Sequence, residues 1–218
     1  MTKSLLPYLL CALLMSSLSA ATAQDTTATS ANAAMTTSSE AKPVTMGEQA
    51  PDAVVFDEDG NPLKLSDIYS SGPTMLIFYR GGWCPYCNTH LGKLAEAEDK
   101  IKALGYQIYA ISPDSPEHLK SSKEQRAGKY QLLSDSSADA INAFGLAFRV
   151  DDLTYQRYKE FKKPVDLEVW AGGESHHLLP VPAAYLVDKS GKVTYEFHHT
   201  NYKNRVDVET LLKAAGAK

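Results

Sequence analysis

The sequence has few cysteines, no strong imbalance of charge and no long basic run. Only 3 of its 218 residues are cysteine, and 22 basic residues stand against 26 acidic ones, which gives a formal net charge of −4. The absence of a basic run argues against nucleic acid as a partner. Hydrophobic residues make up 44% of the chain, which is enough to bury an ordinary globular core.

The first 23 residues have the pattern of a secretory signal peptide. Lys3 supplies a positive charge, residues 5–18 are apolar, and Ala21-Thr22-Ala23 has the small-x-small pattern of a cleavage site. The alternative, a retained membrane anchor, would need a longer apolar run. Cys11 does not fit a lipoprotein cleavage site. We therefore predict an exported protein, periplasmic or secreted, with no stable membrane insertion after cleavage.

Without the leader, the chain would keep two cysteines, Cys84 and Cys87, in a C-x-x-C motif. In an oxidising compartment, this pair has no other thiol in the chain to cross-link with. A zinc site usually needs four ligands, and no second cysteine pair exists to complete one. A structural disulfide seldom closes so small a loop. The sequence therefore predicts a redox-active dithiol, with no cofactor and no metal.

The sequence around the motif predicts a strand that runs directly into a helix. Residues 74–79 form a continuous apolar run, typical of a strand buried on both faces. Residues 88–104 have apolar side chains near helical spacing. Cys84 would then lie at a helix N-terminus, where unpaired N–H groups and the helix dipole favour a thiolate. Arg80 is a candidate for further stabilisation of that thiolate, although a surface ion pair is the alternative.

Composition divides the rest of the chain into a tether and one domain. Residues 24–45 are rich in Thr, Ser and Ala and are interpreted as a disordered tether. Residues 46–216 alternate predicted strands with predicted helices, which requires a mixed α/β sheet with helices on both faces, preceded by an N-terminal hairpin. The long polar and aromatic segment 148–179 does not fit this alternation and is interpreted as an insertion with a function or an interface. The predicted strands are 54–56, 62–65, 74–79, 106–111, 130–135, 183–188 and 192–197, and the predicted helices are 67–69, 88–104, 117–127, 138–147 and 206–215.

The order of these elements and the W-C-x-x-C after a buried strand resemble the thioredoxin fold. The stretch Gly47-Glu48-Gln49-Ala50-Pro51-Asp52, the Asp-Gly hairpin and the Y-R-G-G-W-C-P-Y-C motif resemble the peroxiredoxin branch, the alkyl hydroperoxide reductase and thiol-specific antioxidant family. The resemblance covers residues 46–216. It implies a thioredoxin-like fold, a peroxide substrate and an external dithiol reductant such as a thioredoxin.

The resemblance assigns roles to individual residues. Cys84 falls at the position of the peroxidatic cysteine, and Pro85 matches the proline that follows it in several relatives. The family usually has Thr or Ser three residues before this cysteine, where this chain has Gly81. Its Arg before the late strand corresponds here to Pro182, which instead matches the cis-proline of thioredoxins. The chain thus combines a peroxiredoxin-like body with a thioredoxin-like centre.

Two functions remain open on these residues. In a thiol peroxidase, Cys84 would reduce a peroxide, and Cys87 would resolve the sulfenic acid as a Cys84–Cys87 disulfide. In a disulfide oxidoreductase acting on exported proteins, Cys84 would attack a partner's disulfide and Cys87 would release it. A redox-inert binding module would leave the motif without a role. We favour the peroxidase because its resemblance spans more residues than the departures at Gly81 and Pro182.

Other residues near the motif have both functional and structural interpretations. Trp83 covers the cysteines or simply packs in the core. Gly81 and Gly82 either offer backbone N–H donors to a substrate or form a plain turn. His90 is interpreted as an ordinary helix-face histidine. The pairs His176-His177 and His198-His199 have no spacing that unites them in a metal site.

Overall fold

The computed structural model describes residues 37–123, 130–160, 168–171 and 174–217. The predicted signal peptide (1–23) and residues 24–36 of the predicted tether lie outside this part. The helices are η1 (Ser38–Glu40), α1 (Leu65–Ser71), α2 (Pro85–Glu96), α3 (Glu98–Ala103), α4 (Pro116–Lys123), α5 (Asp139–Ala143), α6 (Asp152–Lys159) and α7 (Val208–Ala214). The strands are β1 (Val54–Phe56), β2 (Pro62–Lys64), β3 (Thr74–Phe78), β4 (Gln107–Ser112), β5 (Gln131–Ser134), β6 (Ala147–Arg149), β7 (Glu168–Ala171), β8 (Glu174–Pro180), β9 (Ala183–Val187) and β10 (Val193–His198).

The main sheet is mixed and has β3 and β4 near its centre. Seven of the described strands pair in the order β10-β9-β3-β4-β5-β1-β2. β3, β4 and β5 run parallel, whereas β9 and β10 on one side and β1 and β2 on the other are antiparallel. All five residues of β3 are buried, as expected for an apolar strand covered on both faces. The C-terminal ends of the parallel strands meet at one edge of the sheet.

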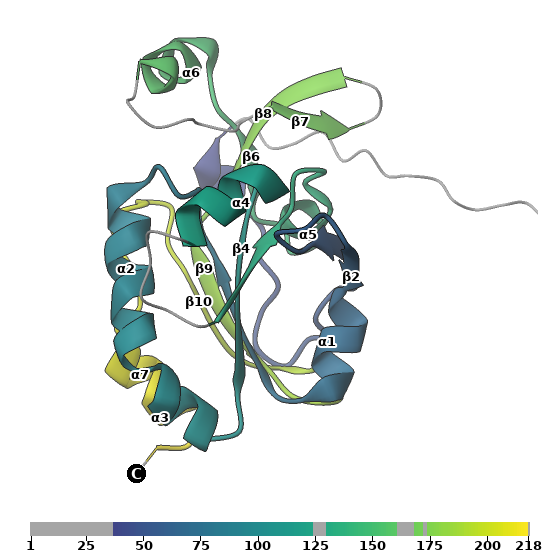
Figure 1. Ribbon diagram of the computed structural model, residues 1–218, viewed down its shortest axis with the longest axis vertical. Coiled ribbons are helices and arrows are strands. Elements are labelled where there is room, and N and C mark those ends of the chain that lie inside the picture. The colour runs from purple at the N-terminus through teal and green to yellow at the C-terminus, as the bar shows by residue number, and fades with distance from the viewer. Residues whose placement is uncertain (1–36, 124–129, 161–167, 172–173, 218) are drawn as a thin grey trace, which may run out of the picture. The chain divides into compact units, whose positions relative to one another are not determined.

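Helices cover both faces of this sheet (Figure 1). One core lies between the sheet and α2, α3 and α7, and it includes Met75 and Ile77 of β3. The other core lies against α1 and α5 and includes Leu76 and Phe78 of the same strand. Successive side chains of a strand point to opposite faces, so one apolar strand contributes to both cores. The predicted α/β architecture is confirmed.

The helix predicted for residues 88–104 begins three residues earlier, at Pro85, and is divided at Ala97. The structure has α2 from Pro85 to Glu96 and α3 from Glu98 to Ala103, with Ala97 between them at φ −98° and ψ 1°. Pro85 begins α2 because a proline at the first helical position needs no hydrogen-bond partner for its nitrogen. The helix therefore begins directly after Cys84.

The ordered chain begins earlier than the predicted boundary at Met46. The backbone N–H groups of Lys42 and Val44 donate hydrogen bonds to the carbonyls of Gly145 and Phe144. Gly145 has φ +65°, and a Cβ there would lie 2.1 Å from the Lys42 carbonyl oxygen. Because a glycine allows this close backbone approach, the segment before Met46 packs on the domain. Lys42 and Val44 are thus held on the domain, and the bounds of the tether at 24–45 stay a prediction.

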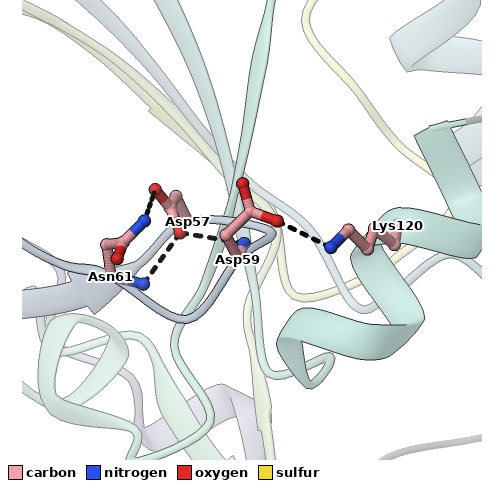
Figure 2. A network of polar contacts seen from close by, with 4 residues as sticks. All are labelled: Asp57, Asp59, Asn61 and Lys120. Atoms are coloured by element: carbon pink, nitrogen blue, oxygen red, sulfur yellow. Dashed lines mark hydrogen bonds and ion pairs between the residues drawn. The ribbon is translucent and has the colours of Figure 1, made fainter.

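The N-terminal hairpin is confirmed, and its turn is held by side chains. The Asp57 carboxylate accepts hydrogen bonds from the backbone N–H of Asp59 and from both nitrogens of Asn61 (Figure 2). Lys120 of α4 lies 2.6 Å from the Asp59 carboxylate. Both of these side chains are exposed, so this ion pair contributes little to stability.

The insertion at 148–179 carries structure of its own. β8 pairs with β6 and with β7 in a small antiparallel sheet, and α6 lies between β6 and β7 in sequence. Asp151 begins α6, and its side chain accepts a hydrogen bond from the backbone N–H of Thr154. The strands of this small sheet were not predicted, because the polar and aromatic composition of segment 148–179 does not distinguish a strand from a loop.

Candidate dithiol active site

The structure places both cysteines where β3 passes into α2, as the sequence predicted. Cys84 is the N-terminal cap residue of α2, and Cys87 lies in its first turn. Both are reduced, and their exposed fractions are only 1% and 0%. The Cys84 thiol hydrogen-bonds the Cys87 sulfur. The pair can therefore interconvert between a dithiol and a disulfide without a large movement.

The surroundings of the two thiols shift their pKa values in opposite directions. The pKa of Cys84 is raised because its S–H donates to Cys87 and because it is buried, and these effects outweigh the Cys87 backbone N–H and the Arg80 charge. The pKa of Cys87 is lowered to about 6, although burial opposes this, by the Cys84 thiol, by the charge of Arg205 and by smaller hydrogen bonds. The hydrogen bond between the sulfurs and the nearby arginine thus favour an anion at Cys87 in the resting pair, and the nucleophilic Cys84 thiolate stays a prediction.

Arg205 is a residue of the site that sequence reasoning missed. It lies between β10 and α7, and its Nη2 atom is 3.3 Å from the Cys87 sulfur. Its Nη1 atom donates to the backbone carbonyls of Tyr202 and Asn204. Nothing in the local sequence ties Arg205 to the motif, because a fold contact brings the two segments together.

Arg80 is buried in a group of aromatic rings above the cysteines. Its guanidinium carbon lies 4.9 Å from the ring centroid of Trp83, 5.4 Å from that of Tyr158 and 4.2 Å from that of Tyr202. It also donates a hydrogen bond to the Tyr158 hydroxyl. Cation–π contacts of this kind stabilise a buried cation. Arg80 lowers the Cys84 pKa through its charge, an effect smaller than the rise caused by the Cys87 side chain and by burial.

The structure explains why this chain has Gly81 where relatives have Thr or Ser. Gly81 has φ +139°, and a Cβ there would lie 2.4 Å from Trp83 Nε1 and 2.6 Å from Asp114 Oδ1. The space for a family-type side chain is thus occupied by the indole and the carboxylate. Asp114 is buried at the end of β4 and accepts hydrogen bonds from the Gly82 N–H (2.7 Å) and the Ser112 hydroxyl (3.0 Å). It fixes the loop before Cys84 and is a second residue that the sequence did not reveal.

Trp83 forms part of the cover over the site. Its exposed fraction is 8%, and its ring centroid lies 5.1 Å from that of Tyr158 in α6. The Gly82 carbonyl accepts a hydrogen bond from the Asn88 side chain of α2. The Gly82 N–H is taken by Asp114, so it is not available to a substrate in this conformation. Part of the insertion therefore closes the same site that the motif forms.

The predicted cis bond before Pro182 is wrong, because the peptide bonds of the described residues are all trans. The Val181 N–H donates to the Leu146 carbonyl, and the Pro182 carbonyl accepts from the His199 N–H. These bonds keep the backbone extended between β8 and β9. Pro182 is buried and directly precedes Ala183, which pairs with Phe78 at the end of β3. It thus lies at the sheet edge from which the cysteine loop begins.

The histidines do not gather in one place. His90 is buried in α2, and its pKa is lowered to about 4 by burial and by the charge of Arg205. His177 stacks on Tyr155, His198 contacts the Glu196 carboxylate, and His199 bonds within its own loop. The side chain of His176 lies outside the described part. Within that part, no cluster of three or more His, Cys, Asp or Glu residues has metal-binding geometry. Nor does any described helix combine the length and apolarity needed to cross a membrane.

Comparison with known proteins places this arrangement in a family. The model of the AhpC/TSA family matches residues 46–196. The chain belongs to the AhpC/TSA family. It is 23% identical over 163 residues to the thiol-disulfide oxidoreductase ResA of Bacillus thuringiensis, covering 74% of this chain and 75% of that protein. It is 29% identical over 104 residues to the peroxiredoxin Bcp of Escherichia coli, covering 48% of this chain and 66% of that protein.

Solved structures agree with this fold. Reduced Prx3 of Vibrio vulnificus superposes with a TM-score of 0.63 at 20% identity, over 80% of this chain and 99% of that one. Peroxidoxin BcpB of Mycobacterium tuberculosis gives a TM-score of 0.58 at 18% identity, over 79% and 96%. The prediction of a thioredoxin-like fold is confirmed, as is the peroxiredoxin-like family. The protein is an oxidoreductase of the thioredoxin-like, peroxiredoxin-type class.

Proposed function

We propose that this protein is a thiol peroxidase that reduces hydrogen peroxide or organic hydroperoxides through Cys84. The observation that carries this proposal is the burial of the pair: Cys84 is 1% exposed and lies in one buried cluster with Trp83, against which Tyr158 packs. A peroxide is small enough to reach such a sulfur, whereas oxidation by a protein disulfide would require the cover to open, as the later reduction by a protein dithiol also does. The peroxiredoxin relatives support the same substrate class.

The reaction begins with a proton shift inside the pair. When the proton of the Cys84 thiol moves to Cys87 along their hydrogen bond, Cys84 becomes the nucleophilic thiolate. It attacks one peroxide oxygen, the O–O bond breaks, and an alcohol or water leaves after protonation. Cys87 then attacks the Cys84 sulfenic acid, water leaves, and the disulfide forms. An external dithiol, thioredoxin-like or other, restores the reduced pair.

A second candidate is a thiol–disulfide oxidoreductase acting on exported proteins. The ResA relative, which aligns over 74% of this chain, favours it. So does the position of the two cysteines in one helical turn, where Cys87 can resolve a mixed disulfide on Cys84. The two candidates share their nucleophile, their resolving cysteine and their oxidised form, so the substrate is what separates them.

One experiment compares the two substrates directly. Equal samples of the reduced protein are mixed with hydrogen peroxide or with a disulfide-bonded model protein, and the Cys84–Cys87 disulfide is measured by mass spectrometry over time. The peroxidase proposal expects stoichiometric disulfide formation with peroxide well before any with the protein. Faster oxidation by the protein disulfide would reverse the assignment.

The export of the protein is also part of the proposal. Residues 1–23 would direct secretion and be removed, which leaves the C-x-x-C pair in a periplasmic or extracellular space. Fractionation of cells with N-terminal sequencing of the product tests this. Recovery of an intact N-terminus in the cytoplasm would contradict it.

A further inference from the structure

The Arg205 side chain that contacts Cys87 is held in place by other hydrogen bonds. The guanidinium is fixed by two backbone carbonyls, of Tyr202 and Asn204, and its other nitrogen lies 3.3 Å from the Cys87 sulfur. No carboxylate of the described residues pairs with it. The Tyr202 ring in turn lies over Arg80. The loop before α7 thus places the Arg205 guanidinium at Cys87 and the Tyr202 ring against the guanidinium of Arg80.

The Cys87 sulfur is surrounded by donors. It accepts hydrogen bonds from the Cys84 thiol, the Arg80 backbone N–H and the Arg205 guanidinium. Its exposed fraction is 0%, so a charge there needs such partners within the protein. The charged side chains that act on the pair are Arg80 and Arg205, and the titratable side chain of His90 lies near Arg205. His90 stays neutral near pH 7 because its pKa is lowered to about 4, which leaves the two arginines as the local cations.

We propose that Arg205 is a catalytic residue of the dithiol centre and that it stabilises the Cys87 sulfur as a leaving group when the Cys84–Cys87 disulfide is reduced. The proposal deepens the proposed function and applies to either candidate substrate, because both cycles pass through this disulfide.

The step balances in atoms and electrons. A thiolate of the reducing dithiol attacks the Cys84 sulfur, the Cys84–Cys87 bond breaks, and its electron pair goes to Cys87. Cys87 leaves as a thiolate beside Arg205, and a mixed disulfide joins the reductant to Cys84. The second reductant thiol then attacks the reductant's own sulfur. Cys84 is released with a proton from that thiol, and the reductant leaves as a disulfide.

Magnitudes favour a leaving-group role over a role in resolution. The pKa of Cys87 is about 6, against about 8.5 for an ordinary thiol. At pH 7 this raises the thiolate fraction about thirtyfold, but nucleophilicity falls about tenfold over the same range, so attack by Cys87 gains little. A lower pKa always helps a leaving group. It also stabilises the reduced pair about tenfold at pH 7, which corresponds to a reduction potential about 30 mV higher.

The reduction potential tests this proposal. The protein is equilibrated with glutathione redox buffers at pH 7, and the oxidised fraction is measured for the wild type, Arg205→Met, Arg205→Lys and, as a matched control at an exposed arginine, Arg149→Met. We expect Arg205→Met to stabilise the disulfide up to about tenfold, or about 30 mV. The reduction potential of Arg205→Lys should lie between those of the wild type and Arg205→Met, and that of Arg149→Met should match the wild type. An unchanged potential in a folded Arg205→Met protein would overturn the proposal.

A second measurement covers the case in which Arg205→Met does not fold. In Cys84→Ser, Cys87 is the only thiol of the pair, and its ionisation is followed by ultraviolet absorbance against pH. We expect a pKa below that of an ordinary thiol, and a value at or above about 8.5 would overturn the role of Arg205. Neither measurement uses a peroxide or a protein disulfide as substrate. A failure of the proposed peroxidase activity is therefore distinguishable from a failure of this inference.

Discussion

The Arg205 guanidinium lies 3.3 Å from the Cys87 sulfur, although 118 positions separate the two residues in the chain. The contact joins the loop before α7 to the first turn of α2. Together with the Cys84 thiol, it lowers the pKa of Cys87, whereas burial and the hydrogen bond to Cys87 raise the pKa of Cys84. Cys84 keeps the position at the start of the helix, and Cys87 receives the charge. The two cysteines therefore differ in role because their surroundings differ.

Substitution of either cysteine should separate these roles. Cys84→Ser is expected to abolish turnover, because it removes the proposed nucleophile and leaves Cys87 without a partner for the disulfide. Cys87→Ser should still react once and then stop as a trapped sulfenic acid with peroxide, or as a mixed disulfide with a protein. Mass spectrometry of the product identifies which species forms. Full turnover by Cys84→Ser would refute the nucleophile assignment.

Restoring the family's usual residue at Gly81 should damage the site. Gly81→Thr places a Cβ within 2.6 Å of both Trp83 and Asp114 at a backbone with φ +139°. We expect a loss of about 1–3 kcal/mol in the free energy of unfolding, from backbone strain alone, together with slower oxidation of Cys84. Chemical denaturation measures the first effect. Wild-type stability in this variant would show that the loop relaxes freely.

Gly92 provides the matched control for this substitution. It lies in α2, its φ is not positive, and a Cβ there would meet nothing within 4 Å. Gly92→Ala should raise the free energy of unfolding by roughly 0.4–1 kcal/mol, because alanine loses less backbone entropy on folding. The two glycine substitutions should therefore shift stability in opposite directions.

Tyr158 should control access to the cysteines. Its ring lies 5.1 Å from that of Trp83, and its hydroxyl accepts a hydrogen bond from Arg80. Tyr158→Ala is expected to speed alkylation of Cys84 by a bulky maleimide several-fold, with a smaller effect for a small reagent. Leu153→Ala is the control, because Leu153 is 64% exposed on the same helix. Equal acceleration in both variants would mean that α6 as a whole, and not Tyr158, limits access.

Stability should fall as pH rises through the range in which Asp135 titrates. Burial raises the pKa of Asp135 to about 7, although the Ala140 and Ile141 N–H groups bond its carboxylate. Between about pH 4 and 7 the folded state binds the proton that the unfolded state has lost, so this group's stabilising contribution, present at low pH, is lost. Urea unfolding across this range should show a flatter dependence for Asp135→Asn than for the wild type. An identical pH dependence of the free energy of unfolding in the two proteins would contradict the raised pKa of Asp135.

Much of the fold was readable from the sequence because local signals and burial agreed. The apolar run at 74–79 could only be a buried strand, and the C-x-x-C after it had to lie near a helix start. The beginning of α2 was placed three residues too late, at Asn88, because the apolar spacing starts there, although Pro85 is favoured at the first helical position. The two sheet-edge hairpins followed from their turn residues.

The site was less predictable because its key contacts are long-range. Asp114 contacts the motif from the segment after β4, and Arg205 contacts it from the loop between β10 and α7. No spacing in the sequence predicts either contact. The pKa shifts of the cysteines depend on their surroundings in the fold, so the position at the helix N-terminus alone could not give them. The cis bond at Pro182 was inferred from a resemblance that does not extend to this link between β8 and β9.

The rate of Cys84 oxidation by hydrogen peroxide tests the proposed peroxidase function most directly. The reduced protein is mixed with peroxide in a stopped-flow instrument under pseudo-first-order conditions, and the second-order rate constant is compared with that of free cysteine at the same pH. We predict a rate constant far above that of the free thiol, lost in Cys84→Ser and retained for the first oxidation step in Cys87→Ser. A rate constant no greater than that of free cysteine would contradict the peroxidase function.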